Sequence, residues 1–220
     1  MSLKRVTKKN INIFGKGSAC GLPDSSYSRN KKFAPVLNNI QGINKNSFVF
    51  LYVGRPFKRK GFNLMVESFM TAFPSKVTNT HLLIAGCTRN ELHKIVDEVP
   101  HNIHALGVVS DMKSLYQFAK VVVLPSYHEG FGYALLEGAA AKCALISSNI
   151  PGPDSIVVPG HTGDVFEVGD SFGLINLLQN FYLNPELVSN YSENAYIEAC
   201  KYKRTKILPS YSDFMEEALK

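Results

Sequence analysis

Apolar residues in the middle of the chain fall into two alternating patterns. Ser47 to Gly54 is a nearly continuous apolar run, which is typical of a strand buried on both faces. From Gly61 to Phe73, apolar side chains recur at intervals of three and four residues, which predicts an amphipathic helix. The same patterns predict further strands at 81–85, 103–106, 121–124 and 144–147, and further helices at 90–98, from Ser110 or Asp111, from near Phe131, and at 171–183, 185–200 and 207–219.

This alternation of strands and helices predicts an α/β fold, a Rossmann-like doubly wound parallel sheet covered by helices. Such sheets bind ligands beyond the carboxyl ends of their strands, at a switch in strand order. We therefore expect one crevice, lined by the turns that follow Val53, Ala85, Leu106 and Leu124.

The remaining stretches set the expected boundaries of the domain. Residues 149–163 are rich in Gly and Pro and are predicted to form loops. The polar stretch 30–46 has the composition of a connector that enters the domain. The predicted organisation is an N-terminal strand and basic connector over 1–45, one Rossmann-like domain over 46–200, and a C-terminal helix over 201–220.

Composition narrows the class of protein. The 220 residues are 45% hydrophobic and 19% charged, which fits a globular domain and excludes a disordered chain. No apolar run approaches the roughly 18–20 residues of a membrane span, and the start has no apolar stretch of a signal peptide. The four cysteines form no C-x-x-C pair, so we expect reduced thiols in a cytosolic protein, without disulfides or zinc.

The net charge of +6 is concentrated at one end of the chain. Residues 1–32 carry eight Lys or Arg and one acid, whereas the other 188 residues carry 16 basic and 17 acidic side chains. Such a segment can contact anionic lipid or nucleic acid. A solvated edge is the favoured interpretation, because no aromatic residues interleave the charges as a nucleic-acid surface requires.

The segment from Pro125 to Glu137 carries the strongest indication of a ligand site. Gly130 and Gly132 follow a predicted strand and precede a helix, where backbone amides can approach an anion such as phosphate. Glu129 and Glu137 offer acceptor oxygens suited to pairs of sugar hydroxyls, and we expect them roughly 10 Å apart along the helix axis, about two turns. One would then hold a sugar and the other a ribose across a diphosphate. In the structural alternative, Glu129 caps the helix and Glu137 faces solvent.

A cationic loop follows the first predicted core strand, between Gly54 and Gly61. Arginine offers phosphate a bidentate fork and lysine a compact charge, so the loop is a candidate diphosphate site. The alternative is a solvated charge run. Its cations are Arg55, Lys58, Arg59 and Lys60.

Five elements together resemble glycosyltransferase family 4 in order and spacing, over roughly residues 45–200. They are Gly-Arg…Lys-Gly at 54–61, Leu-Ile-Ala-Gly at 83–86, Leu-Gly-Val-Val-Ser at 106–110, Leu-Pro-Ser…Glu-Gly-Phe-Gly…Leu-Glu at 124–137, and Pro-Gly-Pro-Asp…Gly-His-Thr-Gly…Gly-Asp at 151–170. Glu129 and Glu137 match the E-x7-E pair of that family.

The resemblance implies the C-terminal half of a GT-B glycosyltransferase, which binds the nucleotide sugar. It implies retaining, metal-independent transfer of a hexosyl-type sugar, and the sequence contains no Asp-x-Asp pair that would suggest Mg²⁺ or Mn²⁺. Carried over, the catalytic residues are Arg55 and Lys60, which grip the diphosphate and stabilise the leaving group, and Glu129. The donor-binding residues are Gly54, then Gly86, Gly107, Val108 and Val109 near the base, Gly130, Phe131 and Gly132 near the sugar, and Glu137 at the ribose.

The same resemblance sets expectations for partners. A UDP- or GDP-linked sugar is expected as the donor substrate, without a cofactor, and a glycan or lipid-linked acceptor is expected to bind the missing N-terminal half. The cytoplasm, with an open alternative at the inner face of the cytoplasmic membrane, is the expected location. Because the acceptor half is absent, we expect this chain alone to bind donor weakly and transfer no sugar.

Two alternative functions stay open, and a third is disfavoured by the spacing of the two glutamates. A GT-B sugar-nucleotide 2-epimerase would share the diphosphate site, and a non-catalytic nucleotide-sugar-binding domain would share the fold. A glycosidase that uses the two glutamates is disfavoured, because retaining glycosidases place their carboxyls about 5–5.5 Å apart.

Overall fold

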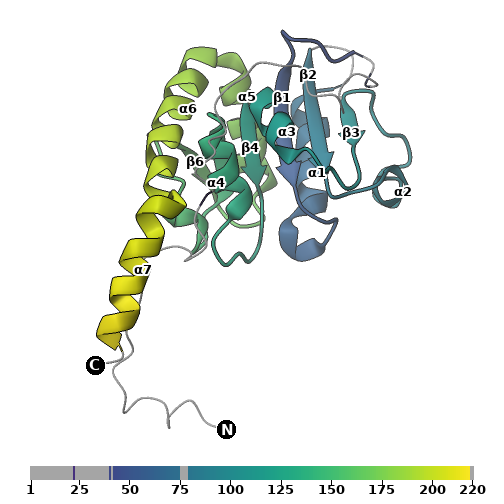
Figure 1. Cartoon of the computed structure of the whole chain (residues 1–220). Coiled ribbons are helices and arrows are strands. Elements are labelled where there is room, and N and C mark those ends of the chain that lie inside the picture. Colours follow the sequence, from purple (N-terminus) through teal and green to yellow (C-terminus); the bar gives the residue numbers. More distant parts are fainter. Residues whose placement is uncertain (1–21, 23–39, 41, 75–78, 219–220) are drawn as a thin grey trace, which may run out of the picture.

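A six-stranded parallel sheet forms the centre of the computed structural model, which describes residues 22, 40, 42–74 and 79–218 (Figure 1). The strand order is β3-β2-β1-β4-β5-β6, so the chain adds strands first on one side of β1 and then on the other. This confirms the predicted doubly wound Rossmann-like sheet and places the switch in strand order between β1 and β4. The strands are β1 Phe48–Val53, β2 Thr80–Ala85, β3 Ile103–Ala105, β4 Val121–Leu124, β5 Ala144–Ser148 and β6 Gly163–Phe166.

Successive side chains of β1 enter two different cores. Val49 and Leu51 share one core with side chains of α3, α4 and α6, whereas Phe50 and Tyr52 share the other with α1 and α5. Because both faces are covered, this strand carries almost only apolar side chains, which explains the continuous apolar run. The helices are α1 Phe62–Ala72, α2 Arg89–Leu92, α3 Met112–Phe118, α4 Tyr133–Ala140, α5 Ser171–Leu183, α6 Pro185–Ala199 and α7 Arg204–Ala218, with 3-10 turns η3 Lys58–Lys60, η4 Pro153–Ser155 and η5 Cys200–Tyr202.

The sixth strand was not predicted from the sequence. In β6 only Gly163 and Phe166 are buried, so the run is too short and too polar to give a strand pattern. Gly163 is required there by packing, since a Cβ at this position would lie 1.9 Å from the carbonyl oxygen of Leu145.

Three helix boundaries differ from the prediction by two residues or more. Helix α2 ends at Leu92 instead of continuing to residue 98, after a single turn closed by a capping box between Thr88 and Glu91. Helix α4 begins at Tyr133, two residues later than expected, because Gly132 adopts a left-handed φ of 91° and serves as its N-cap. Helix α7 begins three residues earlier than predicted.

A segment distant in sequence joins the end of the domain. Leu22 is buried and forms a parallel bridge with Lys203, at the junction between η5 and α7. Helix α7 then extends away from the sheet (Figure 1). Apart from Leu22, Ile40 and the residues from Gly42 onward, the predicted basic connector lies outside the described residues.

The expectations about membrane spans and cysteines can be compared with the structure for the described residues. No helix in the described ranges combines the length and apolar character needed to cross a lipid bilayer. The cysteines described, Cys87, Cys143 and Cys200, are free thiols, the first two buried.

Candidate functional site

The loop after β1 is fixed in place by a buried tyrosine and by a close contact with β4. Tyr52 donates from its hydroxyl toward the carbonyls of Arg55, at 3.2 Å, and Lys60, at 3.4 Å, so it links both ends of the loop. Burial raises the pKa of Tyr52, which keeps this hydroxyl a donor. At Gly61 a Cβ would lie 1.8 Å from the carbonyl oxygen of Pro125, so only glycine allows this approach. The cationic loop therefore lies directly against the chain that leaves β4.

The first predicted pair of site residues meets across this contact. Lys60, from the loop after β1, forms an ion pair with Glu129, from the loop after β4, and the two side chains are only 19% and 16% exposed. The Ser126 hydroxyl lies 3.4 Å from the same carboxylate oxygen. Both charged residues line a pocket of about 420 Å³ together with Gly130, Phe131 and Gly132. The structure thus brings together these five residues predicted from the sequence.

A second pocket lies on the other side of the cationic loop, with a volume of about 290 Å³. Arg55 lines it together with Gly86, Gly107 and Val108, all predicted to border the ligand. Gly86 adopts φ 96°, and a Cβ there would lie 2.8 Å from the carbonyl oxygen of Gly54, so this wall requires glycine. The Gly86 amide also donates to the Gly107 carbonyl, at 2.7 Å, which joins the strand ends of β2 and β3.

Three predicted residues do not line either of these pockets. Gly54 directly follows β1, and its amide donates to the Ala85 carbonyl at 2.9 Å. Val109 is half-buried and packs against the core on the α4 side of the sheet. Glu137 is the fifth residue of α4, so it lies little more than one turn into the helix instead of two. Its carboxylate accepts a hydrogen bond of 2.9 Å from the hydroxyl of Tyr116 in α3.

Sequence reasoning missed the residues that hold these groups. Tyr52, Tyr116 and Ser126 are buried, and each contacts a loop or carboxylate of the site. Tyr52 and Tyr116 lie among apolar residues, so their spacing in the sequence indicates only that they belong to the core. Nothing in the sequence shows what their hydroxyls bond to.

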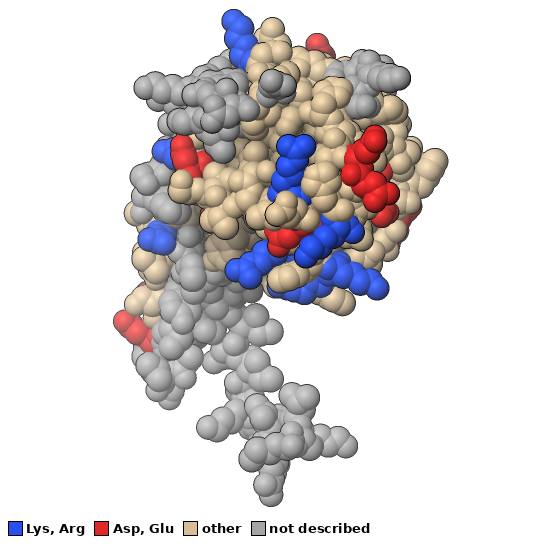
Figure 2. Space-filling model, turned by 90° about the vertical axis from the view of Figure 1, so that its right-hand side faces the viewer, with Lys and Arg blue, Asp and Glu red and all other residues tan. Residues whose placement is uncertain are grey.

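Positive charge is concentrated near the two pockets. Arg55, Lys58, Arg59 and Lys60 all follow β1, and the last three form η3. On the face shown in Figure 2, Lys and Arg side chains gather toward the lower edge, with acidic side chains among them. Helix α4 has Gly132 as its N-cap and no side-chain cap, so its first amides add partial positive charge beside Glu129. This edge can bind a ligand with a central anionic group and hydroxyls at both ends.

Within the described ranges, no three His, Cys, Asp or Glu side chains are arranged as ligands of a metal ion. The groups that line the two pockets include cations, carboxylates, hydroxyls and backbone amides.

Comparison with known proteins identifies relatives of this chain. The model of the family described as "Glycosyl transferases group 1" matches residues 35–198. The capsular polysaccharide biosynthesis glycosyltransferase CapM of Staphylococcus aureus is 33% identical over 178 residues, covering 75% of this chain and 44% of CapM. The lipopolysaccharide core biosynthesis mannosyltransferase LpcC of Rhizobium leguminosarum bv. viciae is 28% identical, covering 64% of this chain and 43% of LpcC.

Solved structures share the fold at lower identity. Anabaena Alr3699/HepE, solved with UDP and glucose, superposes with a TM-score of 0.77 at 15% identity, covering 89% of this chain and 55% of that one. The C-terminal domain of a group 1 glycosyl transferase, LpcC of Francisella tularensis, gives a TM-score of 0.69 at 22% identity, covering 83% and 99%. The chain spans about half the length of the curated relatives it matches.

Proposed function

Because this chain belongs to the group 1 glycosyl transferases, we propose that it binds the nucleotide-sugar donor as the C-terminal half of a GT-B glycosyltransferase. The observation that carries the proposal is the placement of two pockets on either side of one cationic loop. A nucleotide sugar has the same order of parts, with a base and ribose, a central diphosphate and a sugar.

In the proposed binding mode, the base occupies the pocket beside Gly86, Gly107 and Val108. The diphosphate lies along the loop between Arg55 and Lys60, whose charges match its own. The glycine walls favour a flat base, because they allow the backbone to approach it closely.

The donor sugar occupies the pocket of Glu129, Gly130 and Gly132. The Glu129 carboxylate accepts from sugar hydroxyls, as a buried acceptor-only group can. Glu137 is proposed to accept from the ribose hydroxyls, in an orientation set by Tyr116.

The proposed reaction breaks the bond between the anomeric carbon and the diphosphate oxygen and forms a bond from that carbon to the oxygen of an acceptor hydroxyl, with retention of configuration. The proton of this hydroxyl passes to the departing diphosphate. Negative charge develops on the departing diphosphate, and Arg55 and Lys60 stabilise it more as that charge grows. These cations supply the charge that a metal ion would otherwise provide, so we propose metal-independent transfer.

The acceptor is proposed to be a glycan or a lipid-linked glycan, bound by the half that this chain does not contain. The names of CapM and the rhizobial LpcC support an acceptor of the bacterial envelope. Such an acceptor would place the reaction in the cytoplasm, at the inner face of the membrane.

Isothermal titration calorimetry on the 220-residue chain tests donor binding with UDP, GDP, ADP and their glucose or mannose conjugates. We expect one nucleoside diphosphate to bind, and Lys60→Met to weaken it about tenfold or more, as expected for the loss of a charge-assisted contact. Lys142→Met is the matched control, since it removes a lysine from the exposed ion pair with Glu193. Absence of binding, or equal affinity in Lys60→Met, would contradict the proposal.

Two further measurements separate the alternatives. Binding is expected to be unchanged in excess EDTA, and a tenfold loss would indicate a metal-dependent site. Product analysis of the full-length protein with donor and acceptor is expected to yield a new glycosidic bond, whereas an epimerised nucleotide sugar would indicate the isomerase.

A further inference from the structure

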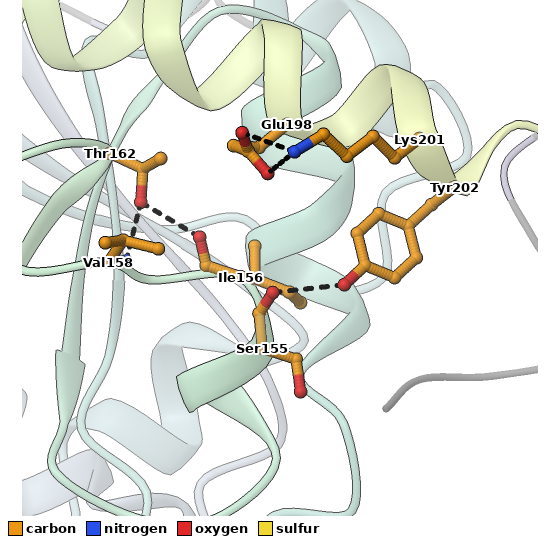
Figure 3. Close-up of polar contacts among 7 residues, drawn as sticks. All are labelled: Ser155, Ile156, Val158, Thr162, Glu198, Lys201 and Tyr202. Carbon is orange, nitrogen blue, oxygen red and sulfur yellow. Dashed lines mark hydrogen bonds and ion pairs between the residues drawn. The ribbon is translucent and has the colours of Figure 1, made fainter. Parts of the chain in front are cut away.

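Tyr202, the last residue of η5, contacts one residue of the pocket proposed for the sugar and the turn η4, which contains no lining residue but lies next to Gly152. Its hydroxyl donates to the carbonyl of Ser155, at the end of η4, over 3.0 Å (Figure 3). Its ring lies 5.6 Å from the ring of Phe131, which lines the pocket. No sequence pattern distinguishes this tyrosine from other aromatic residues of the C-terminal helices.

The turn η4 is held by hydroxyls at two consecutive carbonyls. Next to Ser155, the carbonyl of Ile156 accepts from the Thr162 hydroxyl at 2.9 Å (Figure 3). Thr162 is fully buried and also accepts from the Val158 amide at 2.8 Å. The turn is therefore fixed from both sides, by Thr162 within its own loop and by Tyr202 from the C-terminal helices.

The loop of η4 lies directly against residues 129–132, here called the glycine turn, which line the pocket proposed for the sugar. At Gly152, a Cβ would lie 2.8 Å from the carbonyl oxygen of Gly130 and 3.1 Å from that of Glu129. In a trans peptide, the carbonyl and the following amide point in opposite directions. Carbonyls that face Gly152 thus direct the amides of Gly130 and Phe131 away from it.

The backbone of Tyr202 is itself held by the segment that precedes the domain. Its carbonyl accepts from the Leu22 amide at 2.7 Å, and the Arg204 amide donates to the Leu22 carbonyl at 2.9 Å. Burial raises the pKa of Tyr202, so its hydroxyl stays protonated and donates at physiological pH.

From these contacts we propose that Tyr202 is a positioning residue, which keeps the amides of Gly130 and Phe131 directed toward the donor sugar. It acts through Ser155 and Gly152 on one side and through the Phe131 ring on the other. The proposal rests on the proposed function and extends it to a residue outside the pocket.

Hydrogen exchange of the free chain tests the hold on η4 without a ligand. Tyr202→Phe is expected to speed exchange about threefold or more in peptides that contain the Ser155, Ile156 and Val157 amides, which bond to the carbonyls of Gly152 and Pro153. Tyr191→Phe is the matched control, because it removes a tyrosine hydroxyl that bonds to Asp164, away from the pocket. Equal exchange in Tyr202→Phe and the unsubstituted chain would overturn the proposal.

Calorimetry tests whether Tyr202 affects binding of the sugar part of the donor. The ligands are UDP and UDP-glucose, or whichever nucleoside diphosphate and sugar conjugate bind to the unsubstituted chain. Tyr202→Phe is expected to weaken the sugar conjugate about threefold and leave the diphosphate unchanged, and Tyr202→Leu to weaken the conjugate further. An equal loss for both ligands, or no loss for either, would overturn the proposal. If the unsubstituted chain binds no nucleotide, the proposed function fails, and hydrogen exchange alone decides the role of Tyr202.

Discussion

The two pockets beside the cationic loop lie at one edge of the sheet but are built by different means. The pocket of about 420 Å³, here called the Lys60 pocket, depends on charged side chains, since Lys60 and Glu129 form an ion pair in its wall. The pocket of about 290 Å³ is called the Arg55 pocket. Glycines with positive φ line both pockets, but an added Cβ at Gly132 would meet side chains, at 3.3 Å or more, whereas at Gly86 it would lie 2.8 Å from the backbone carbonyl oxygen of Gly54. Backbone shape therefore matters most in the Arg55 pocket. Substitutions in the first are therefore expected to change ligand affinity, and substitutions in the second to change folding. The following experiments test this difference.

The largest expected effect is a loss of stability at Gly86. We expect Gly86→Ala to lower the free energy of unfolding by about 3 kcal/mol, because it combines a strained φ with a contact on the Gly54 carbonyl. Urea denaturation measures it. Gly107→Ala is the control, since its φ is also positive but no atom lies within 4 Å of the added Cβ, and about 1 kcal/mol is expected. Equal losses would show that the contact is unimportant.

The next effect concerns the charge pair. We expect Glu129→Gln to strengthen UDP binding about threefold to tenfold, because it frees Lys60 and removes a negative charge beside the diphosphate. The same substitution is expected to weaken the sugar conjugate relative to UDP. Calorimetry with both ligands measures the two changes. A weakening of UDP itself would contradict the proposed arrangement, and Ser126→Ala, which removes only a 3.4 Å contact, serves as the control.

A smaller change in stability is expected at Thr88, which lines the Arg55 pocket. Its hydroxyl and amide both bond to Glu91 at 2.8 Å in a capping box. Thr88→Ala is expected to cost about 1 kcal/mol of unfolding free energy and to change nucleotide affinity less than twofold. A large loss of affinity at unchanged stability would show that this side chain, and not the backbone, recognises the base.

The smallest effect is expected at Tyr116, which orients Glu137. Tyr116→Phe is expected to weaken UDP about threefold, the effect of one hydrogen bond, and to leave 2′-deoxy-UDP unchanged. The comparison of the two ligands by calorimetry isolates the ribose contact. Equal weakening of both would indicate that Glu137 acts on the fold and not on the ribose.

The fold could be predicted from the sequence where both faces of a strand are covered. Four of the six strands, β1, β2, β4 and β5, give runs of this kind. In contrast, β3 buries only Ile103, and β6 buries only its first and last residues. Its glycine is explained by contact with Leu145, a residue of another strand. Such a requirement depends on the neighbouring backbone, which local spacing does not reveal.

The site could be predicted where loops follow strands, because carboxyl ends of parallel strands share one edge. This reasoning placed Arg55, Lys60 and Glu129 together, although their roles stay predictions. It could not find the hydroxyl contacts of Tyr52, Tyr116 and Tyr202, because the spacing of an aromatic residue does not reveal what its hydroxyl bonds to. It also placed Glu137 too deep in its helix, because Gly132 delays the start of α4.

The bridge between Leu22 and Lys203 also bears on the order in which the chain folds. All six strands and the glycine turn are synthesised before residue 202 leaves the ribosome. A contact between residues so far apart in sequence closes a large loop and therefore forms slowly. The sheet can thus assemble while the chain is still being made, whereas the contacts of Tyr202 with Ser155 and Phe131 form only after residue 202 has been made.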